Sequence, residues 1–426
     1  MKWKKDRVGP GTEIALDRQR RALLGGVAGA VATALLASAC KSSEEEVVVE
    51  SVAAVEPETT PEPAPVAPDP AIPPGAAAVT EEELAWARQF LAQQASVDLH
   101  CHPGMFFFQG MTPEDPMLQK MASMGVFTER TVADMAAGQL SAALFATVAD
   151  INLIGAGEKG LYARREFEPG EAYADHQRQM AVLQNMADTG LVAPVRSVPD
   201  LLAAKHAGKV GAMFSCEGGD FLEEKGERLA EAWEAGIRSI QLVHYHINQL
   251  GDIQTEAPKH NGLTAFGREA VVEMNRLGML IDMAHATFET TRDAAELSSQ
   301  PIMVSHSFIA DGEARHPRLL SEDHARIVAG TGGLVGAWPT GIGNPDFPSF
   351  IGRLFRLVDL IGIDHVGLGT DMDANFKPVW TNYRQLPHVP VALKRGGMSD
   401  EEIVKVLSGN FMRVFDEVTH GAGETS

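Results

Sequence analysis

Histidine and carboxylate side chains recur at the ends of short apolar runs in this 426-residue chain. The first run ends in a closely spaced pair, His100 and His102, and a spacing of two places both imidazoles on the same face of a β-strand. Imidazole and carboxylate groups bind zinc at about 2.0–2.2 Å, and a catalytic zinc site keeps one position open for water. The other candidate groups that follow such runs are Glu217, His244, His285, His306 and Asp371.

This set of residues is too large for one tetrahedral zinc ion. A single histidine at the end of a strand is more often a hydrogen-bonded structural residue than a metal ligand. Two ions that share a carboxylate would account for five ligands together, and the alternative, a stack of buried histidines without metal, would leave several polar groups without partners. We therefore predict two zinc ions per chain. The five candidate ligands are His100, His102, Glu217, His285 and His306.

The apolar runs themselves predict the elements that position these residues. Eight strand-like runs alternate with amphipathic helical patterns, which favours a parallel sheet covered by helices and suits a closed (β/α)8 barrel. Active sites of such barrels lie at the carboxyl ends of the strands, so six strands would deliver polar residues to one rim. The predicted strands are residues 97–102, 142–149, 210–216, 239–243, 280–284, 302–305, 334–337 and 365–369. The predicted helices include residues 227–235, 265–277, 289–298, 321–329 and 350–360.

Composition and charge exclude several classes of function. A net charge of −21 argues against nucleic-acid binding, which rests on cationic contacts to phosphate. The first strand is not followed by Gly-x-Gly-x-x-Gly or by a Walker-type loop, so nucleotide binding gains no support. Three cysteines are too few for a disulfide scaffold. Cys101 and Cys216 adjoin inward-facing candidate ligands, so strand alternation points their sulfur atoms outward and predicts two free thiols.

Residues 1–40 resemble an export signal. Arg20 and Arg21 precede an uncharged apolar stretch at residues 22–39, as in a twin-arginine signal. Small residues then lead into Cys40, as in a bacterial lipobox, and we expect Cys40 to carry a lipid anchor. A cleaved signal without lipid and an uncleaved transmembrane anchor are the alternatives. The expected location is therefore outside the cytoplasm, periplasmic or at the cell surface, on a bacterial membrane.

Residues 41–83 predict a disordered tether. They hold eight of the 24 prolines and eleven acidic residues, with one lysine and no aromatic residue. Such a composition buries too little apolar surface to offset the entropy lost on ordering. We therefore expect one catalytic (β/α)8 domain at residues 84–426.

Seven short motifs follow one another between residues 97 and 418. They are Asp-x-His-x-His at 98–102, Glu-Gly-Gly at 217–219, Gly-Leu-Thr-Ala-Phe-Gly at 262–267, Leu-Ile-Asp-Met-Ala-His at 280–285, Val-Ser-His-Ser at 304–307, His-Val-Gly-Leu-Gly-Thr-Asp-Met-Asp at 365–373 and Gly-Asn-Phe-Met-Arg-Val-Phe at 409–415. No single motif is specific, but the ordered set resembles the membrane (renal-type) dipeptidases, a family of two-zinc barrel enzymes that cleave dipeptides.

The resemblance implies a division of the five ligands between two ions. His100 and His102 would bind the first zinc ion, and Glu217 would bridge the pair. His285 and His306 would bind the second zinc ion. A hydroxide shared by the two ions would then attack the scissile peptide bond, since zinc lowers the pKa of bound water to about 7.

The resemblance also implies three residues that act on the substrate. His244 would polarise the substrate carbonyl, and Asp371 would pass a proton to the leaving amine and hold the substrate's own amine. Arg318 would bind the α-carboxylate through two parallel hydrogen bonds, which limits substrates to short peptides with a free terminus. For Arg318, a solvated loop residue without a functional role is the alternative.

Three features depart from the family pattern. His102 stands where the family has aspartate, so the first metal site gains a neutral ligand and loses a negative charge, a change that zinc tolerates. Leu319 follows Arg318 where the family has asparagine. Residues 336–340 after the seventh strand do not follow the pattern that lines the substrate pocket. These departures affect the expected preference for dipeptides.

Two other functions are consistent with the same residues. A two-metal amidohydrolase would cleave another amide, such as a lactam, an N-acyl amino acid or a cell-wall fragment. A surface lipoprotein could instead use a decayed barrel for binding, although the complete set of candidate ligands argues against decay. The expected partners are a small peptide substrate, the membrane through the lipid anchor and, as an alternative to a monomer, a second copy in a homodimer. No nucleic-acid partner is expected.

Overall fold

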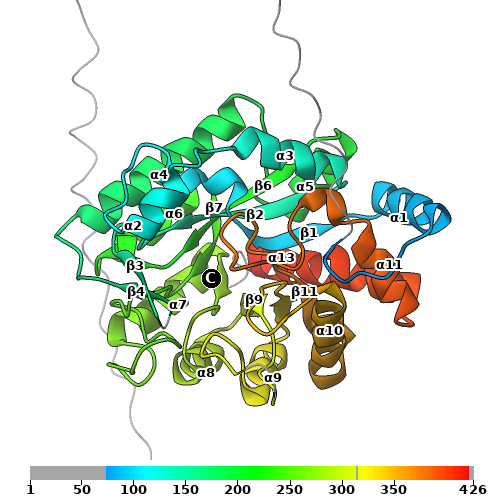
Figure 1. The fold of residues 1–426 in the computed structure, drawn as a ribbon. Coiled ribbons are helices and arrows are strands. Elements are labelled where there is room, and N and C mark those ends of the chain that lie inside the picture. Colours follow the sequence, from blue (N-terminus) through cyan, green and yellow to red (C-terminus); the bar gives the residue numbers. More distant parts are fainter. Residues whose placement is uncertain (1–72, 159, 313–314, 422–426) are drawn as a thin grey trace, which may run out of the picture. The chain divides into compact units, whose positions relative to one another are not determined.

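The central parallel sheet of this protein has eight strands in the order β1-β2-β6-β7-β8-β9-β10-β11 and a ninth, short strand that pairs with β6 (Figure 1). The computed structural model describes residues 73–158, 160–312 and 315–421. All eight predicted strands are present, each within two residues of its predicted start and within two residues of its predicted end. The strands are β1 (Val97–Cys101), β2 (Ala142–Val148), β6 (Gly211–Glu217), β7 (Ile237–Gln241), β8 (Leu280–Asp282), β9 (Met303–Ser307), β10 (Leu334–Ala337) and β11 (Val366–Leu368).

The sheet closes on itself between its first and last strands. Just beyond β11, the backbone N–H of Asp371 donates to the carbonyl oxygen of His100 at 2.8 Å. The N–H of His102 donates in turn to the carbonyl oxygen of Met372 at 3.0 Å. These bonds join the carboxyl ends of β1 and β11, so the predicted (β/α)8 barrel is confirmed.

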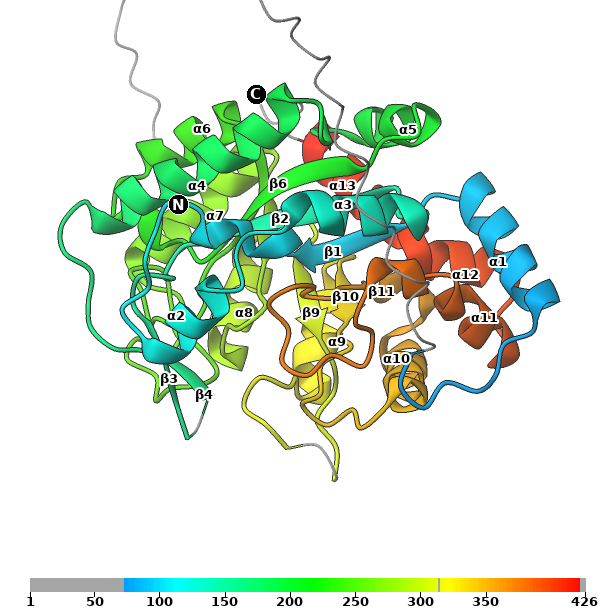
Figure 2. The same ribbon diagram turned by 45° about the horizontal axis from the view of Figure 1, so that its top comes forward.

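Helices surround the barrel in both views (Figures 1 and 2). The predicted helix at residues 265–277 coincides with α7, where the Thr264 hydroxyl accepts from the N–H of Gly267 and Gly278 ends the helix at a φ of 71°. The helices are α1 (Glu81–Gln93), α2 (Pro116–Ala122), α3 (Thr128–Ala137), α4 (Glu171–Asp188), α5 (Val198–His206), α6 (Glu227–Glu234), α7 (Ala265–Leu277), α8 (Phe288–Leu297), α9 (Glu322–Gly330), α10 (Phe347–Ile361), α11 (His388–Arg395), α12 (Asp400–Val404) and α13 (Asn410–Gly421).

The two largest apolar clusters pack at different places on the barrel strands. Apolar residues at the amino ends of the strands, such as Val97, Leu280 and Leu334, pack with Phe411 and Phe415 of α13. This packing fills the end of the barrel opposite to the polar rim. The larger cluster lies between the outer faces of the strands and the surrounding helices, and it includes both Cys101 and Cys216. Both cysteines are buried and free, which confirms the two predicted free thiols.

The folded domain begins before the predicted boundary at residue 84. Helix α1 starts at Glu81, because Thr80 and Glu83 form a reciprocal capping box. Arg395 then pairs with Glu83 at 2.7 Å, and α1 lies beside α11 (Figure 2). Residues 81–83 therefore belong to the domain, and the predicted tether at 41–83 was too long. The predicted signal with Cys40, and the tether up to residue 72, lie outside the described residues.

The loops hold elements that the sequence did not predict. A hairpin of β3 (Ile154–Gly157) and β4 (Gly160–Ala163) follows β2, and the two-residue strand β5 (Ala193–Pro194) pairs with β6. Short helical turns complete the fold: η1 (Pro103–Phe108), η2 (Asp220–Leu222), η3 (Ile363–His365), η4 (Tyr383–Gln385) and the π-helical turn η5 (Lys405–Gly409). Among the described residues, no helix combines the length and apolar character needed to span a bilayer.

Candidate metal centre

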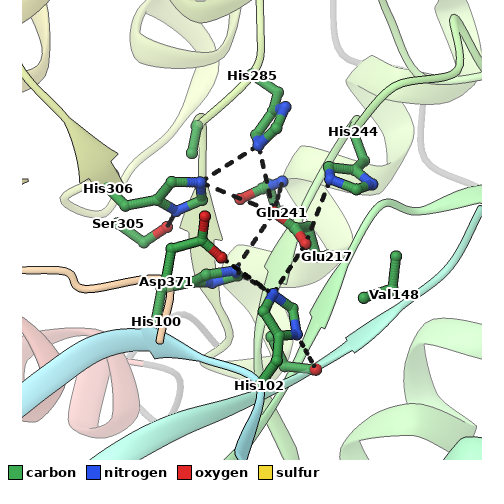
Figure 3. A network of polar contacts seen from close by, with 12 residues as sticks. His100, His102, Val148, Glu217, Gln241, His244, His285, Ser305, His306 and Asp371 are labelled. Atoms are coloured by element: carbon green, nitrogen blue, oxygen red, sulfur yellow. Dashed lines mark hydrogen bonds and ion pairs between the residues drawn. The ribbon is translucent and has the colours of Figure 1, made fainter. Parts of the chain in front are cut away.

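The carboxyl ends of the strands bring the predicted polar residues together (Figure 3). His100 and His102 lie at the end of β1, Glu217 ends β6, and His306 lies within β9. The remaining three follow their strands by three residues, and all seven side chains are buried. The seven residues that the structure assembles are His100, His102, Glu217, His244, His285, His306 and Asp371.

Glu217 is the hub of this cluster. Its Oε1 lies 3.3 Å from Nε2 of His100 and 3.2 Å from Nε2 of His285. Its Oε2 lies 3.2 Å from Nε2 of His102 and 3.4 Å from Nε2 of His244. Glu217 thus lies between the imidazoles predicted for the first ion, His100 and His102, and that of His285, predicted for the second, as expected of a shared carboxylate.

Two overlapping groups have the compactness of a metal site. His100, His102 and Glu217 form one group, and Glu217, His244 and His285 form the other, with ligand atoms within 4.8 Å of one another. The first group contains the three residues predicted for the first ion. In the second group, His244 takes the place expected for His306.

His306 lies at the same centre but has additional partners. Its Nε2 is 3.3 Å from Nε2 of His285, 3.8 Å from Oε1 of Glu217 and 3.1 Å from Nη2 of Arg318. Three imidazoles, those of His244, His285 and His306, therefore lie where the predicted second ion would bind.

Hydrogen bonds on the far side of the rings orient the histidines. The Nδ1–H of His102 donates to the carbonyl oxygen of Ala146 at 2.8 Å, because a carbonyl can only accept. This bond turns Nε2 of His102 toward Glu217, whose Oε2 lies 3.2 Å away. Ser305 holds Nδ1 of His306 at 3.0 Å. Such outer partners fix the ring orientation of metal-binding histidines.

The charges at the centre fit a divalent cation. Burial alone would raise the pKa of Glu217, but His244 and His100 hold that pKa well below its ordinary value, so the group is a carboxylate. Burial lowers the pKa of both His285 and His306 well below the ordinary value, so these imidazoles are neutral. An anion surrounded by imidazole nitrogens is the donor set that zinc prefers. The residues present therefore fit the predicted metal.

His100 differs in charge from these two histidines. Burial lowers its pKa, but the Glu217 carboxylate raises it to about 9. His100 thus carries a proton near neutral pH when no cation competes for its nitrogen. Metal binding at this position would release that proton.

Asp371 completes the polar rim, and its own backbone is strained. Its Oδ1 lies 3.5 Å from Nε2 of His102, and its φ of 55° is in the left-handed region, as is the φ of 69° at His285. Such strain in residues other than glycine is concentrated at functional sites. Burial raises the pKa of Asp371 to about 6, which suits a group that exchanges protons near neutral pH.

Arg318 is buried beside the metal centre, with 1% of its surface exposed, so the alternative of a solvated loop residue is wrong. Its Nη1 donates to Oε1 of Gln254 at 2.9 Å, and its guanidinium carbon lies 5.3 Å from the ring centroid of Trp338. Its Nε has no partner among the described residues. A buried donor without a partner is costly, and a substrate carboxylate would satisfy it.

Several residues that support the centre were not predicted from the sequence. Asp150, which directly follows the second predicted strand, holds Nδ1 of His244 at 2.6 Å. Gln241 donates to Oε1 of Glu217 at 3.3 Å, and Gln254 holds Arg318. The position of Asp150 at a strand end was a usable signal. Gln241 lies inside a predicted strand and Gln254 inside a long loop, so neither had one.

His102 provides a test of the first metal position. Replacement by alanine should remove about one zinc ion per chain, because it removes one of three ligands, whereas His102→Asp should retain both ions. Metal content measured by plasma mass spectrometry on the full-length protein checks this. Cys101→Ala is the matched control, since its sulfur points out of the barrel and donates to Leu144 O. Equal zinc content in His102→Ala and wild type would show that His102 is not a ligand.

Comparison with known proteins points to one family. Residues 84–426 match the family model for membrane dipeptidases (peptidase family M19). The dipeptidase tcpJ of Claviceps purpurea is 30% identical over 229 residues, which cover 51% of this chain and 53% of that protein. The dipeptidase aclJ of Aspergillus oryzae is 28% identical over 277 residues, which cover 61% of this chain and 65% of that protein. The chain thus spans between half and two thirds of the length of these curated relatives.

Solved structures share the barrel. The probable dipeptidase PvdM from Pseudomonas aeruginosa superposes with a TM-score of 0.67 at 19% identity, over 80% of this chain and 100% of that one. A metallo peptidase from Rhodobacter sphaeroides, liganded with a phosphinate mimic of the dipeptide L-Ala-D-Ala, superposes with a TM-score of 0.65 at 17% identity, over 76% of this chain and 99% of that one. At these identities the likeness concerns the fold.

Proposed function

The chain belongs to the membrane dipeptidase family, and from this premise we propose that it is a zinc-dependent dipeptidase whose active site is the cluster around Glu217. One observation carries the proposal: each oxygen of the Glu217 carboxylate faces two imidazole nitrogens at 3.2–3.4 Å. The solved metallo peptidase from Rhodobacter sphaeroides supports a dipeptide substrate, because it was liganded with a dipeptide mimic.

Two zinc ions would share Glu217 as a common ligand. His100 and His102 would hold the first ion, and His285 and His306 the second. When bound, the ions would polarise the scissile carbonyl and lower the pKa of a water molecule so that it attacks near neutral pH. The protein's own residues would bind, orient and exchange protons around that reaction.

Three residues would act on the substrate. Arg318 would bind the α-carboxylate, since its guanidinium is buried at the centre and presents a donor without a partner. His244 would donate from an N–H at Nε2, the ring nitrogen nearer to Glu217, to the scissile carbonyl oxygen. Asp371 would take up a proton and deliver it to the leaving amine, for which a pKa of about 6 is suitable.

The N-terminal residues extend the proposal to location. Residues 1–40 would direct export from a bacterial cytoplasm, and Cys40 would carry the lipid that anchors the enzyme to the membrane. The proposal rests on Arg20 and Arg21, the apolar stretch and the small residues before Cys40. The acidic, proline-rich segment that follows Cys40, up to about residue 72, would then act as a tether.

Substrate class is tested with the zinc-loaded full-length protein and a panel of amides. Free D- and L-series dipeptides should give the highest kcat/KM, and the same dipeptides with an amidated carboxyl terminus should be poor substrates. A higher kcat/KM for a lactam or an N-acyl amino acid would reassign the protein to the broader amidohydrolases. Absence of hydrolysis throughout the panel, together with absence of bound metal, would favour a binding protein.

A further inference from the structure

Two histidines that follow β7 are each held by a buried carboxylate that follows another strand of the sheet. Nδ1 of His244 lies 2.6 Å from Oδ1 of Asp150, which follows β2. Nδ1 of His246 lies 2.6 Å from Oδ1 of Asp220, which follows β6. Only the first pair reaches the metal centre, because Nε2 of His244 faces Glu217, whereas Nε2 of His246 lies 2.8 Å from Glu166 on the hairpin side.

We propose that Asp150 is a positioning residue for catalysis, which holds the His244 ring through the N–H at Nδ1 and so turns Nε2 toward the metal centre. This inference rests on the proposed dipeptidase function. Asp150 is fully buried, with 0% of its surface exposed. Its Oδ1 is bound to His244, and its Oδ2 accepts from the backbone N–H of Tyr245 at 2.9 Å.

The backbone of Asp150 is fixed as firmly as its side chain. Its carbonyl oxygen accepts from the N–H groups of Leu153 at 2.8 Å and Ile154 at 3.2 Å, in the turn that leads into β3. Both the backbone and the carboxylate of Asp150 are therefore held by hydrogen bonds. A carboxylate fixed in this way also fixes the orientation of the imidazole bound to it.

The direction of the hydrogen bond determines which nitrogen of His244 faces the centre. An ionised carboxylate only accepts, so Nδ1 must carry the proton that points to Asp150. Nε2 is then the nitrogen that faces Oε2 of Glu217 at 3.4 Å. The ring is also confined by Tyr245 and His285, whose ring centroids lie 4.5 Å away. Asp150 thus orients the His244 ring so that a hydrogen on Nε2 can donate to the substrate carbonyl oxygen, without itself touching the substrate.

Asp150→Asn changes the hydrogen-bonding group of the side chain but keeps its size and shape. An asparagine of the same shape has only one acceptor oxygen for two N–H donors. The N–H of Tyr245 cannot change, so the amide oxygen should turn to it and the amide NH2 should face Nδ1 of His244. His244 must then lose the hydrogen from Nδ1 or turn away from its present orientation.

The expected result is a kcat for dipeptides that is about 10- to 100-fold lower, as is typical when a partner of an active-site histidine is removed. KM and zinc content should stay close to those of wild type, since Arg318 and the predicted ligands are unchanged. Long-range ¹H–¹⁵N correlation spectra of the full-length protein should place a His244 proton on Nδ1 in wild type and alter that signal in Asp150→Asn. His244→Gln assigns the signal.

Asp220→Asn is the matched control, because it makes the same chemical change in a buried carboxylate that holds His246 and accepts from Asn248 at 3.2 Å. It should keep kcat within about threefold of wild type, a much smaller change than the loss of kcat expected for Asp150→Asn.

A wild-type kcat in Asp150→Asn would overturn the proposal. Equal losses of kcat in both variants, with equally lowered melting temperatures, would also overturn it, because the role would then be structural. If wild type cleaves no dipeptide, the proposed function fails, and the spectra alone decide whether Asp150 sets the proton on His244.

Discussion

Glu217→Gln is expected to abolish dipeptide hydrolysis, with kcat/KM falling by a factor on the order of 10³ or more, and to lower the zinc content below two ions per chain. A neutral amide bridges two cations poorly. Bound metal ions stabilise a transition state by several kcal/mol, and each loss of roughly 1.4 kcal/mol lowers the rate tenfold. Each Glu217 oxygen faces two imidazoles, so its replacement affects both predicted metal positions at once. Metal content and kcat/KM are measured on the same full-length preparation.

Glu217→Asp provides the matched comparison for charge. It keeps a carboxylate but shortens the side chain by one methylene, so it should retain more zinc than Glu217→Gln while remaining far less active than wild type. Unfolding curves of the metal-free proteins separate loss of ligand from loss of fold. Full activity with two retained ions in Glu217→Gln would refute the bridging role.

The second large effect is expected at Arg318. Arg318→Ala should lower kcat/KM for free dipeptides by about 10- to 100-fold, because a hydrogen-bonded charge pair contributes about 1.5–3 kcal/mol. Arg318→Lys keeps the charge but loses the planar fork, so its kcat/KM should fall by less. Zinc content should be unchanged, since Arg318 contacts His306 but is not itself a ligand.

Dipeptides amidated at the carboxyl terminus are the control for this second prediction. They lack the carboxylate that Arg318 is proposed to bind, so their poor hydrolysis by wild type should change little in either variant. The variants' melting temperatures report the separate cost of losing a buried side chain that binds Gln254 and packs near Trp338. If Arg318→Ala cleaves free dipeptides as well as wild type does, the carboxylate is bound elsewhere.

Much of the barrel could be predicted from periodicity alone. Each strand is a short apolar run, and most of these runs end in a polar residue where the chain reaches the rim. His100 and His102 illustrate the strength of this signal, because their spacing of two required both rings to face the same side of β1. The ordered motifs then added the family, which the match over residues 84–426 confirms.

The contacts between loops could not be predicted in the same way. The closure of the barrel depends on backbone bonds of Asp371 and Met372 beyond β11, which no periodic pattern encodes. The left-handed backbone at His285 and Asp371 is imposed by the surrounding structure and not by residue type. The start of α1 was missed because the capping box at Thr80 and Glu83 adjoins an acidic, proline-rich stretch whose composition masked it.

Metal reconstitution tests the central claim most directly. Full-length protein is stripped of metal with a chelator, and the initial rate of dipeptide hydrolysis is then measured as zinc is added in small steps. We predict that the metal-free protein is inactive and that the rate rises until two equivalents of zinc are bound per chain. A rate that is unaffected by metal removal, or the absence of dipeptide hydrolysis at two bound equivalents, would contradict the account.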